Sequence, residues 1–275
     1  MPDARMAVTA MSATVTLEEP LVGKKRFALS YGEEWSVPHR MFSLEEVVSY
    51  LHLSKSDVDR LVREKEIPYE QRGGRIVFQK KEVDAWASQR ILGLTANRLT
   101  DYHKASSAKF HDLSKQHAIM PELIHADFIE TTLISKTKAS LMRDMVDFAE
   151  KTGLVVYPKD LLESLRERER LGTTALAGGI ALLHPKNHEP YLFEDSFIVM
   201  GRSVQPIPFG APDGATTDLF FLVCCQDDRI HLHVLARLCM MCLYTSLVLD
   251  LREAGDAATM YDGIVKSERE VIQQL

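Results

Sequence analysis

The sequence lacks the features that mark several large classes of protein. Cysteine is scarce, at four in 275 residues, and no apolar export signal opens the chain, so we expect reduced thiols in a cytoplasmic protein. The most apolar segment, residues 234–251, is interrupted by Arg237 and Asp250 and is too short to span a bilayer, so no membrane contact is predicted. The phosphate loop G-x-x-x-x-G-K-[ST] does not occur, so the sequence supports no nucleotide site.

Metal and redox chemistry find equally little support. The histidines of residues 93–119 have no spacing typical of metal ligands and are interpreted as surface or lightly packed side chains; they are His103, His111 and His117. Cys239 and Cys242 form a C-x-x-C pair, but inside an apolar helical pattern that favours buried thiols. Pro185 interrupts any helix between His184 and His188. We therefore predict no metal and no cofactor.

The charge balance is mildly acidic. The formal net charge is −6, which argues against general coating of nucleic acid but allows a small module with a local basic patch. Residues 1–40 show no sustained periodicity and are expected to form a loose leader.

An ordered module begins at Met41. Ser43 with Glu46 forms a capping box, which predicts a helix there. Ser54 precedes a second apolar stripe that must end near Pro68, because the residue before a proline is disfavoured in a helix. Two short helices separated by about three residues are typical of a helix-turn-helix.

Two strands around a Gly73-Gly74 turn follow, and then a helix from Lys80 to about Ile91. Over residues 41–92 this order resembles the excisionase-like, MerR-type winged DNA-binding domains. The resemblance implies that Ser54–Lys65 is the recognition helix and that Arg72–Lys80 is the wing. The candidate contacts to double-stranded DNA are Ser54, Lys55, Ser56, Arg60, Arg63, Arg72, Arg75 and Lys80.

The charges of this module leave an alternative open. Basic and acidic residues balance over 41–92, and acidic groups facing phosphate weaken binding. The family usually has an aromatic residue at the position of Asp59 and a glycine at that of Lys65. The alternative is a module for protein contacts, including a homodimer.

Residues 93–119 are interpreted as a linker with some helical character, and residues 120–275 as a second domain. Its helices are expected within 123–133 (with a turn), 136–152, 158–170, 231–243, 246–253, 257–265 and 267–274, and its strands at 180–183, 196–200 and 215–225. Helices alternating with strands predict an α/β sandwich, a mixed sheet flanked by helices.

The stretch from Arg168 to His184 is where chemistry is expected. His184 ends a short apolar strand, and a neutral imidazole is a usable nucleophile. The small-residue loop Gly172–Gly179 is expected to present backbone N–H groups, Thr173 or Thr174 a hydroxyl, and Arg168 a guanidinium. A histidine that merely faces solvent at a strand's end explains the spacing equally well.

R-E-R-L-G-T-T-A-L-A-G-G-I-A-L-L-H (168–184) resembles the phosphoryl-acceptor region of enzyme IIA of the bacterial phosphotransferase system, of the fructose, mannitol and nitrogen-regulatory type. P-I-P-F-G-A-P-D-G (206–214), D-L-F-F-L-V (218–223) and H-L-H-V-L-A-R-L (231–238) extend the resemblance. It implies that His184 is the phosphorylated histidine, supported by Arg168, Thr174 and His231. The implied donor is a histidine-phosphorylated phosphocarrier protein.

Several positions depart from that family. It usually has proline before and glycine after the acceptor, where this chain has Leu183 and Pro185, and two loop glycines are replaced by Ala175 and Ala177. The two modules together predict a regulator in which phosphorylation of His184 modulates DNA binding. Two alternatives remain: a phosphoryl-transfer protein whose first module only contacts proteins, and a DNA-binding regulator whose enzyme IIA domain accepts no phosphate.

Overall fold

The computed structural model describes residues 41–107 and 117–274. The predicted leader, residues 1–40, and His111 lie outside the described residues. Residues 39–275 pack as one compact unit, so the two predicted modules touch one another.

The N-terminal module is a small winged helix-turn-helix, as predicted. Its elements are β1 (Met41–Phe42), α1 (Leu44–Leu51), α2 (Lys55–Arg63), β2 (Glu70–Arg72), β3 (Arg75–Gln79) and α3 (Lys80–Leu92). Ser43 and Glu46 make the predicted capping box, and the Ser54 hydroxyl caps α2. The strands pair antiparallel in the order β1-β3-β2, with Gly73 and Gly74 at positive φ in the wing's turn.

The end of α2 explains one departure from the family. Lys65 follows the last turn with φ 57°, in the left-handed region. Glycine reaches this region without strain, whereas a residue with a Cβ pays about 1 kcal/mol or more there. The glycine usual at this position is therefore the residue that the backbone favours.

The segment predicted as a linker contains a packed helix, α4 (Ala96–Ser107), which contacts α8 (Asp228–Tyr244). The prediction of a surface side chain is wrong for His103, which is fully buried and accepts a 3.0 Å hydrogen bond from Arg237 Nε. Arg237 Nη1 is also 3.0 Å from Glu268 Oε1. No sequence spacing signals this contact, because its members come from three separate helices.

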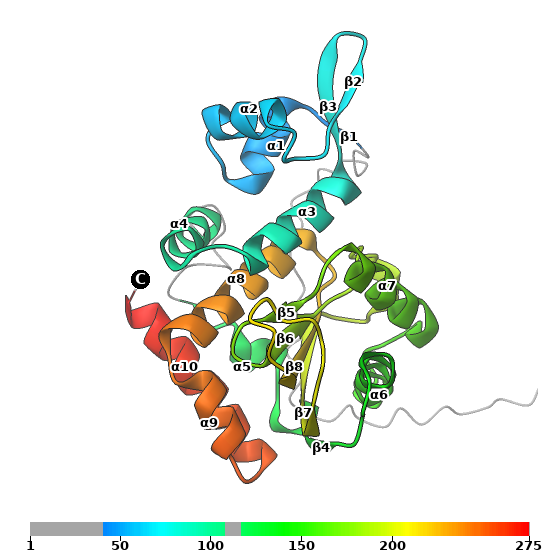
Figure 1. The fold of residues 1–275 in the computed structure, drawn as a ribbon, viewed down its shortest axis with the longest axis vertical. Coiled ribbons are helices and arrows are strands. Elements are labelled where there is room, and N and C mark those ends of the chain that lie inside the picture. The colour runs from blue at the N-terminus through cyan, green and yellow to red at the C-terminus, as the bar shows by residue number, and fades with distance from the viewer. Residues whose placement is uncertain (1–40, 108–116, 275) are drawn as a thin grey trace, which may run out of the picture. The chain divides into compact units, whose positions relative to one another are not determined.

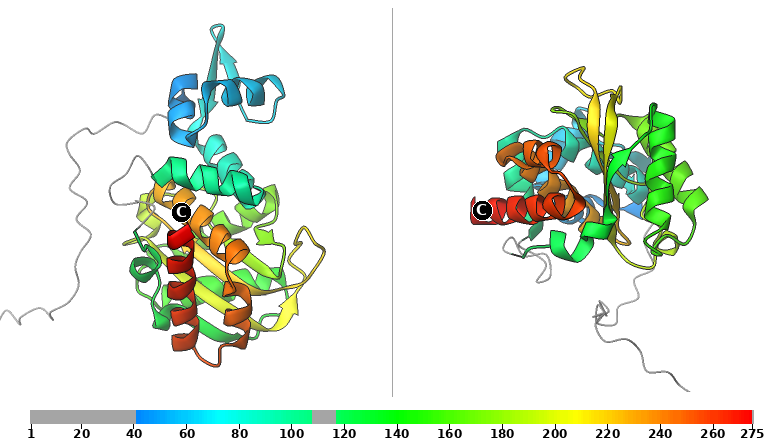
Figure 2. Two further views of the ribbon diagram at one scale, coloured as in Figure 1. Left: turned by 90° about the vertical axis from the view of Figure 1, so that its left-hand side faces the viewer. Right: turned by 90° about the horizontal axis from the view of Figure 1, so that it is seen from below.

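The second domain is a mixed five-stranded sheet between two layers of helices, as predicted (Figure 1). Its strands are β4 (Ile129–Leu133), β5 (Ala175–Leu176), β6 (Ile180–Leu183), β7 (Phe197–Ile207) and β8 (Thr217–Cys224). Its helices are α5 (Met120–Leu123), η2 (Ala126–Phe128), α6 (Lys138–Glu150), α7 (Pro158–Leu171), η3 (Pro190–Leu192), α8, α9 (Leu247–Glu253) and α10 (Ala257–Gln274). The strand order is β4-β7-β8-β6-β5, with β4/β7 and β6/β8 parallel and the other pairs antiparallel. Helices α6 and α7 cover one face, and α8, α9 and α10 the other (Figures 1 and 2).

Three local predictions are corrected. Residues 123–133 hold β4 besides short helices, and the two helices predicted after residue 257 are one, α10, because nothing at Lys266-Ser267 breaks a helix. The loop Gly172–Gly179 is largely a hairpin, since Ala175 pairs with Ala181. The backbone of Ala175 and Leu176 is therefore paired with β6.

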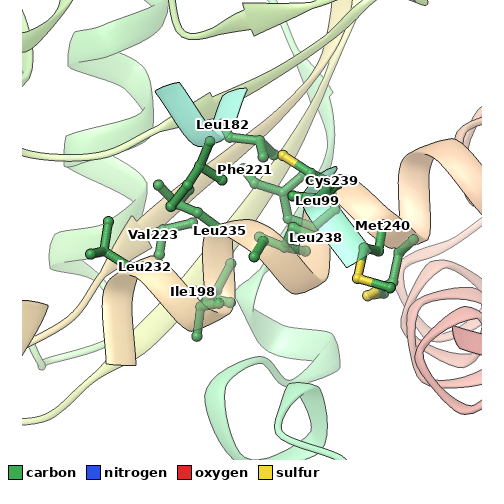
Figure 3. Packing of buried hydrophobic residues seen from close by; sticks show 14 of the residues in the cluster. Leu99, Leu182, Ile198, Phe221, Val223, Leu232, Leu235, Leu238, Cys239 and Met240 are labelled. Carbon is green, nitrogen blue, oxygen red and sulfur yellow. The ribbon is translucent and has the colours of Figure 1, made fainter. Parts of the chain in front are cut away.

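Residues of the central strands β6 and β8 alternate between the two cores. Along β6, Ile180 and Leu182 pack toward α8, and Ala181 and Leu183 toward α6 and α7. The α8-side core, part of which is drawn in Figure 3, continues through α4 and α3 into the winged module. The alternation predicts that His184, the next even-numbered residue, lies on the α8 side.

Candidate functional site

His184 follows β6 directly and is 1% exposed. Its Nδ1 lies 2.8 Å from the carbonyl oxygen of Leu182, and Arg168 Nε donates a 2.9 Å hydrogen bond to its Nε2. Because Nε2 accepts, Nδ1 carries the proton and donates it to Leu182. The ring is therefore held with its lone pair on Nε2, the atom that would act as nucleophile.

Arg168 lies on α7 near its C-terminal end and is 1% exposed. Its Nη1 donates to the carbonyl of Gly172 at 3.0 Å, whereas its buried Nη2 has no hydrogen-bond partner. Desolvation lowers the pKa of Arg168, and Glu169 partly offsets this. Among the described residues Arg168 forms no ion pair. A buried guanidinium with a free donor is suited to hold an anion.

Two more imidazoles complete the cluster. His231, in the first turn of α8, has its ring centroid 4.8 Å from that of His184, and the ring of His188 lies 3.9 Å from His231. The Nδ1 atoms of His231 and His188 are buried without a partner. The described residues include no group of three or more side chains arranged to hold a metal ion.

Burial keeps these rings neutral. Desolvation, followed by the charge of Arg168, lowers the pKa of His184 well below its usual value, and burial acts likewise on His231. The pKa of His188 is lowered to about 3, again mainly by desolvation. All three are uncharged near neutral pH, the form in which an imidazole nitrogen can attack.

The predicted threonine holds the loop. The hydroxyl of Thr174 donates to Glu169 Oε2 at 2.7 Å, and its carbonyl accepts from Leu182 N at 3.0 Å. Thr173 donates its hydroxyl to Phe209 O. Neither hydroxyl is bonded to His184. The structure thus brings together Arg168, His184 and His231, whereas Thr174 makes its hydrogen bonds with Glu169 and Leu182. It also adds His188, which the sequence pattern did not indicate because Pro185 rules out helical spacing with His184.

The glycines expected to present N–H groups lie elsewhere. Gly178 and Gly179 precede β6, at the opposite end of the strand from His184, and the N–H of Gly178 donates to Asp213 Oδ2 at 2.9 Å. Both have positive φ, 90° and 84°, whereas Ala175 and Ala177 do not. The alanine substitutions therefore cause no backbone strain.

Helix α3 of the winged module covers the cluster. Ser88 Oγ lies 3.4 Å from His231 Nε2, and the side chain of Lys80 pairs with Asp228 at the start of α8. Lys81 Nζ is 2.6 Å from Glu189 Oε1. His231 is fully buried as a result of this packing and that of the sheet.

The candidate DNA-contacting residues differ in the hydrogen bonds and ion pairs that they form within the chain. Ser54 is occupied in capping α2, Arg60 pairs with Glu64, and Arg72 pairs with Glu70. Among the candidate cations, Lys55, Arg63 and Arg75 are exposed and form no ion pair within the described part of the chain. Lys80 is held by Asp84 and Asp228. The unpaired cations are the ones best placed to meet phosphate.

The fold and the cluster define a phosphotransferase-type α/β sandwich joined to a helix-turn-helix module. Residues 122–267 match the family described as phosphoenolpyruvate-dependent sugar phosphotransferase system, EIIA 2, and residues 41–91 match a helix-turn-helix domain. The chain belongs to this EIIA 2 family.

The chain is similar to nitrogen regulatory proteins of other bacteria. A nitrogen regulatory protein of Bradyrhizobium diazoefficiens is 31% identical over 152 residues, covering 54% of this chain and 90% of that protein. A nitrogen regulatory protein of Escherichia coli is 32% identical over 120 residues, covering 42% and 71%. The crystal structure of nitrogen regulatory protein IIA-Ntr from Neisseria meningitidis has a TM-score of 0.49 at 23% identity, covering 53% and 99%.

Within the described ranges, no single helix is long and apolar enough to cross a membrane. Only the pair Ile230–Tyr244 and Leu247–Glu253, bent by 79°, reaches that length and composition together.

Proposed function

We propose that this protein is a regulator linked to the phosphotransferase system. In it, His184 accepts a phosphoryl group from a phosphocarrier protein, and the winged helix-turn-helix binds double-stranded DNA. The observation that carries the first half is the pair Arg168–His184: a buried neutral imidazole with its lone pair on Nε2, beside a buried guanidinium that has a free donor and no anion.

The chemistry follows from these contacts. Arg168 Nε releases His184 Nε2, whose lone pair forms the new P–N bond, while the P–N bond of the carrier breaks and its electron pair returns to the carrier's imidazole. Nδ1–H stays bonded to Leu182 O and keeps the ring oriented. Arg168 Nε and the free Nη2 then donate to phosphoryl oxygens, where negative charge resides.

Phosphorylation is tested by incubating the full chain with phosphoenolpyruvate, enzyme I and the phosphocarrier, and measuring intact mass. We expect one phosphoryl group on the wild type and none on His184→Ala. The exposed His125 supplies a matched control, because His125→Ala should be labelled like the wild type. An unlabelled wild type favours the alternative of a DNA-binding regulator with a silent enzyme IIA domain.

DNA binding is supported by the exposed start of α2 and by the wing. Lys55, Arg63 and Arg75 have no ion-pair partner within the described residues. Each phosphate contact contributes about −0.9 to the slope of log K against log salt, so Lys55→Ala and Arg63→Ala should each make the slope less steep by about that amount. Lys159→Ala on α7 is the control. Binding that does not depend on salt favours the alternative of a module for protein contacts.

A further inference from the structure

The face of the enzyme IIA domain over His184 and His231 is covered by other parts of the chain. A phosphocarrier must bring its phosphorylated side chain to His184 Nε2, so it must contact the surface above His184 and His231. These residues are 1% and 0% exposed. No partner can reach Nε2 while this cover is in place.

At His231 the cover is one stripe of α3. Lys80, Asp84 and Ser88 are spaced four residues apart, so they share a face of the helix. Lys80 pairs with Asp228, and Ser88 lies against His231. The neighbouring stripe is apolar and lies in the core that runs from the winged module to α8; it consists of Val83, Ala87 and Ile91. Helix α3 therefore joins the winged module to α8 and lies against the site at His231.

Ser88 contacts His231 through its hydroxyl oxygen, which acts as a hydrogen-bond acceptor. Its hydroxyl donates to Asp84 O at 2.9 Å, so at the 3.4 Å contact with His231 it accepts, and His231 Nε2 donates. A phosphoryl oxygen is also a hydrogen-bond acceptor. Helix α3 thus supplies His231 with the kind of partner that a phosphoryl group on His184 would supply.

Two further polar contacts join α3 to the domain, in addition to the apolar contacts of the shared core. Lys81 pairs with Glu189 with 67% of its side chain exposed, and Gln89 Nε2 lies 3.5 Å from Leu171 O. After α3 the chain passes Gly93 into α4, which is held to the domain by buried Leu99 and by the bond of His103 to Arg237. The segment 93–95 is therefore a natural hinge, with α4 as its fixed side.

We propose that α3 and the phosphocarrier compete for this single face, so that the closed state excludes phosphorylation and a phosphoryl group on His184 excludes α3. The inference rests on the proposed function, because it assigns the regulation of the same histidine. A phosphoryl group adds about 1.5 to 2 negative charges. These would lie beside Ser88, which contacts His231, and would drive α3 outward, so that Lys80 loses its pair with Asp228 and keeps its pair with Asp84.

The test uses the full chain with Ser88→Arg, in which a bulky cation faces His231 and the cation Arg168. We expect His184 to be phosphorylated at least about tenfold faster than in the wild type at limiting carrier, because the observed rate scales with the open fraction. Glu82→Arg, an exposed change on the same helix, should leave the wild-type rate. Equal rates for Ser88→Arg and wild type would overturn the proposal.

A second readout does not depend on phosphorylation. Diethyl pyrocarbonate acylates exposed neutral imidazoles, so the His184 peptide should be protected in the wild type and modified in Ser88→Arg. If this difference appears while neither protein is phosphorylated, the proposed function fails and the occlusion stands. If both are modified alike, the occlusion fails whatever the phosphorylation result.

A milder variant covers the case in which Ser88→Arg does not fold. Lys81→Glu places two carboxylates together at Glu189 and should raise the phosphorylation rate and the diethyl pyrocarbonate reactivity of His184. Adding Glu189→Lys restores the pair with reversed charges and should return both towards wild type. A double variant as reactive as Lys81→Glu would contradict the proposal.

Discussion

Replacing Arg168 by methionine distinguishes the effect of the buried cation on stability from its effect on the phosphorylation rate. The methionine fills similar space but removes the hydrogen bonds to His184 Nε2 and Gly172 O and the free Nη2 donor. Removing a donor aimed at developing charge lowers a rate by about 10²–10³, or about 2.7–4 kcal/mol of transition-state stabilisation. We expect phosphorylation of His184 to slow by that factor.

The stability of the same variant should hardly change. The lost hydrogen bonds from a charged donor are worth about 1.5–3 kcal/mol each. Burial of a cation without an anion costs several kcal/mol, which the methionine removes. These contributions oppose one another, so the free energy of unfolding should stay within about 1 kcal/mol of wild type.

The assay compares Arg168→Met with Leu165→Ala, a buried apolar change on the same helix. Leu165→Ala should cost about 2–5 kcal/mol in urea unfolding, because it leaves a cavity. Phosphorylation rates come from intact mass at timed points. The reasoning is refuted if Arg168→Met is as destabilised as Leu165→Ala while its phosphorylation rate remains that of the wild type.

Three further outcomes are expected. Burial lowers the pKa of His103 to about 2 and that of His233 to about 3, so both stay neutral in the folded state. In the unfolded chain the same histidines have a pKa near 6.5 and take up protons as the pH falls below that value. Their stabilising contribution is therefore complete above pH 7 and is lost on acidification, at about 1.2 kcal/mol each between pH 7.0 and 5.5, measurable by urea unfolding. Lys65→Gly removes the strain of the left-handed φ of 57° and should raise the unfolding free energy by about 1 kcal/mol. An unchanged unfolding free energy would show that this backbone angle is not strained. Gly201→Ala places a Cβ against Leu133 Cδ1 and should lower the unfolding free energy by about 1–3 kcal/mol. An unchanged melting temperature would contradict this expectation.

Local patterns predicted most of the elements because local interactions determine them. The capping box at Ser43 and the cap at Ser54 start helices where expected, and the Gly73-Gly74 turn forms the wing. Apolar runs predicted β6 and β8. The wrong predictions concern segments whose conformation is determined by pairing across the sheet or by packing between helices. Examples are β4 and the hairpin in which Ala175 pairs with Ala181.

The candidate site was predictable in part. The motif from Arg168 to His184 and the later H-L-H indicated which side chains should meet, and the structure brings Arg168, His184 and His231 into contact. His188 was missed because its position against His231 depends on the path of a loop after Pro185, which no periodicity describes. The role of Thr174 differs in detail, since its hydroxyl is bonded to Glu169.

The sequence by itself determined the two modules, their order and the chemistry of the residues around His184, because caps, turns and alternating strands act over a few residues. Only the tertiary structure decided that α3 of the first module lies over the site of the second, with Ser88 on His231. That contact joins residues 143 positions apart. It exists because α3 has a second polar face that a single sequence cannot assign to a partner.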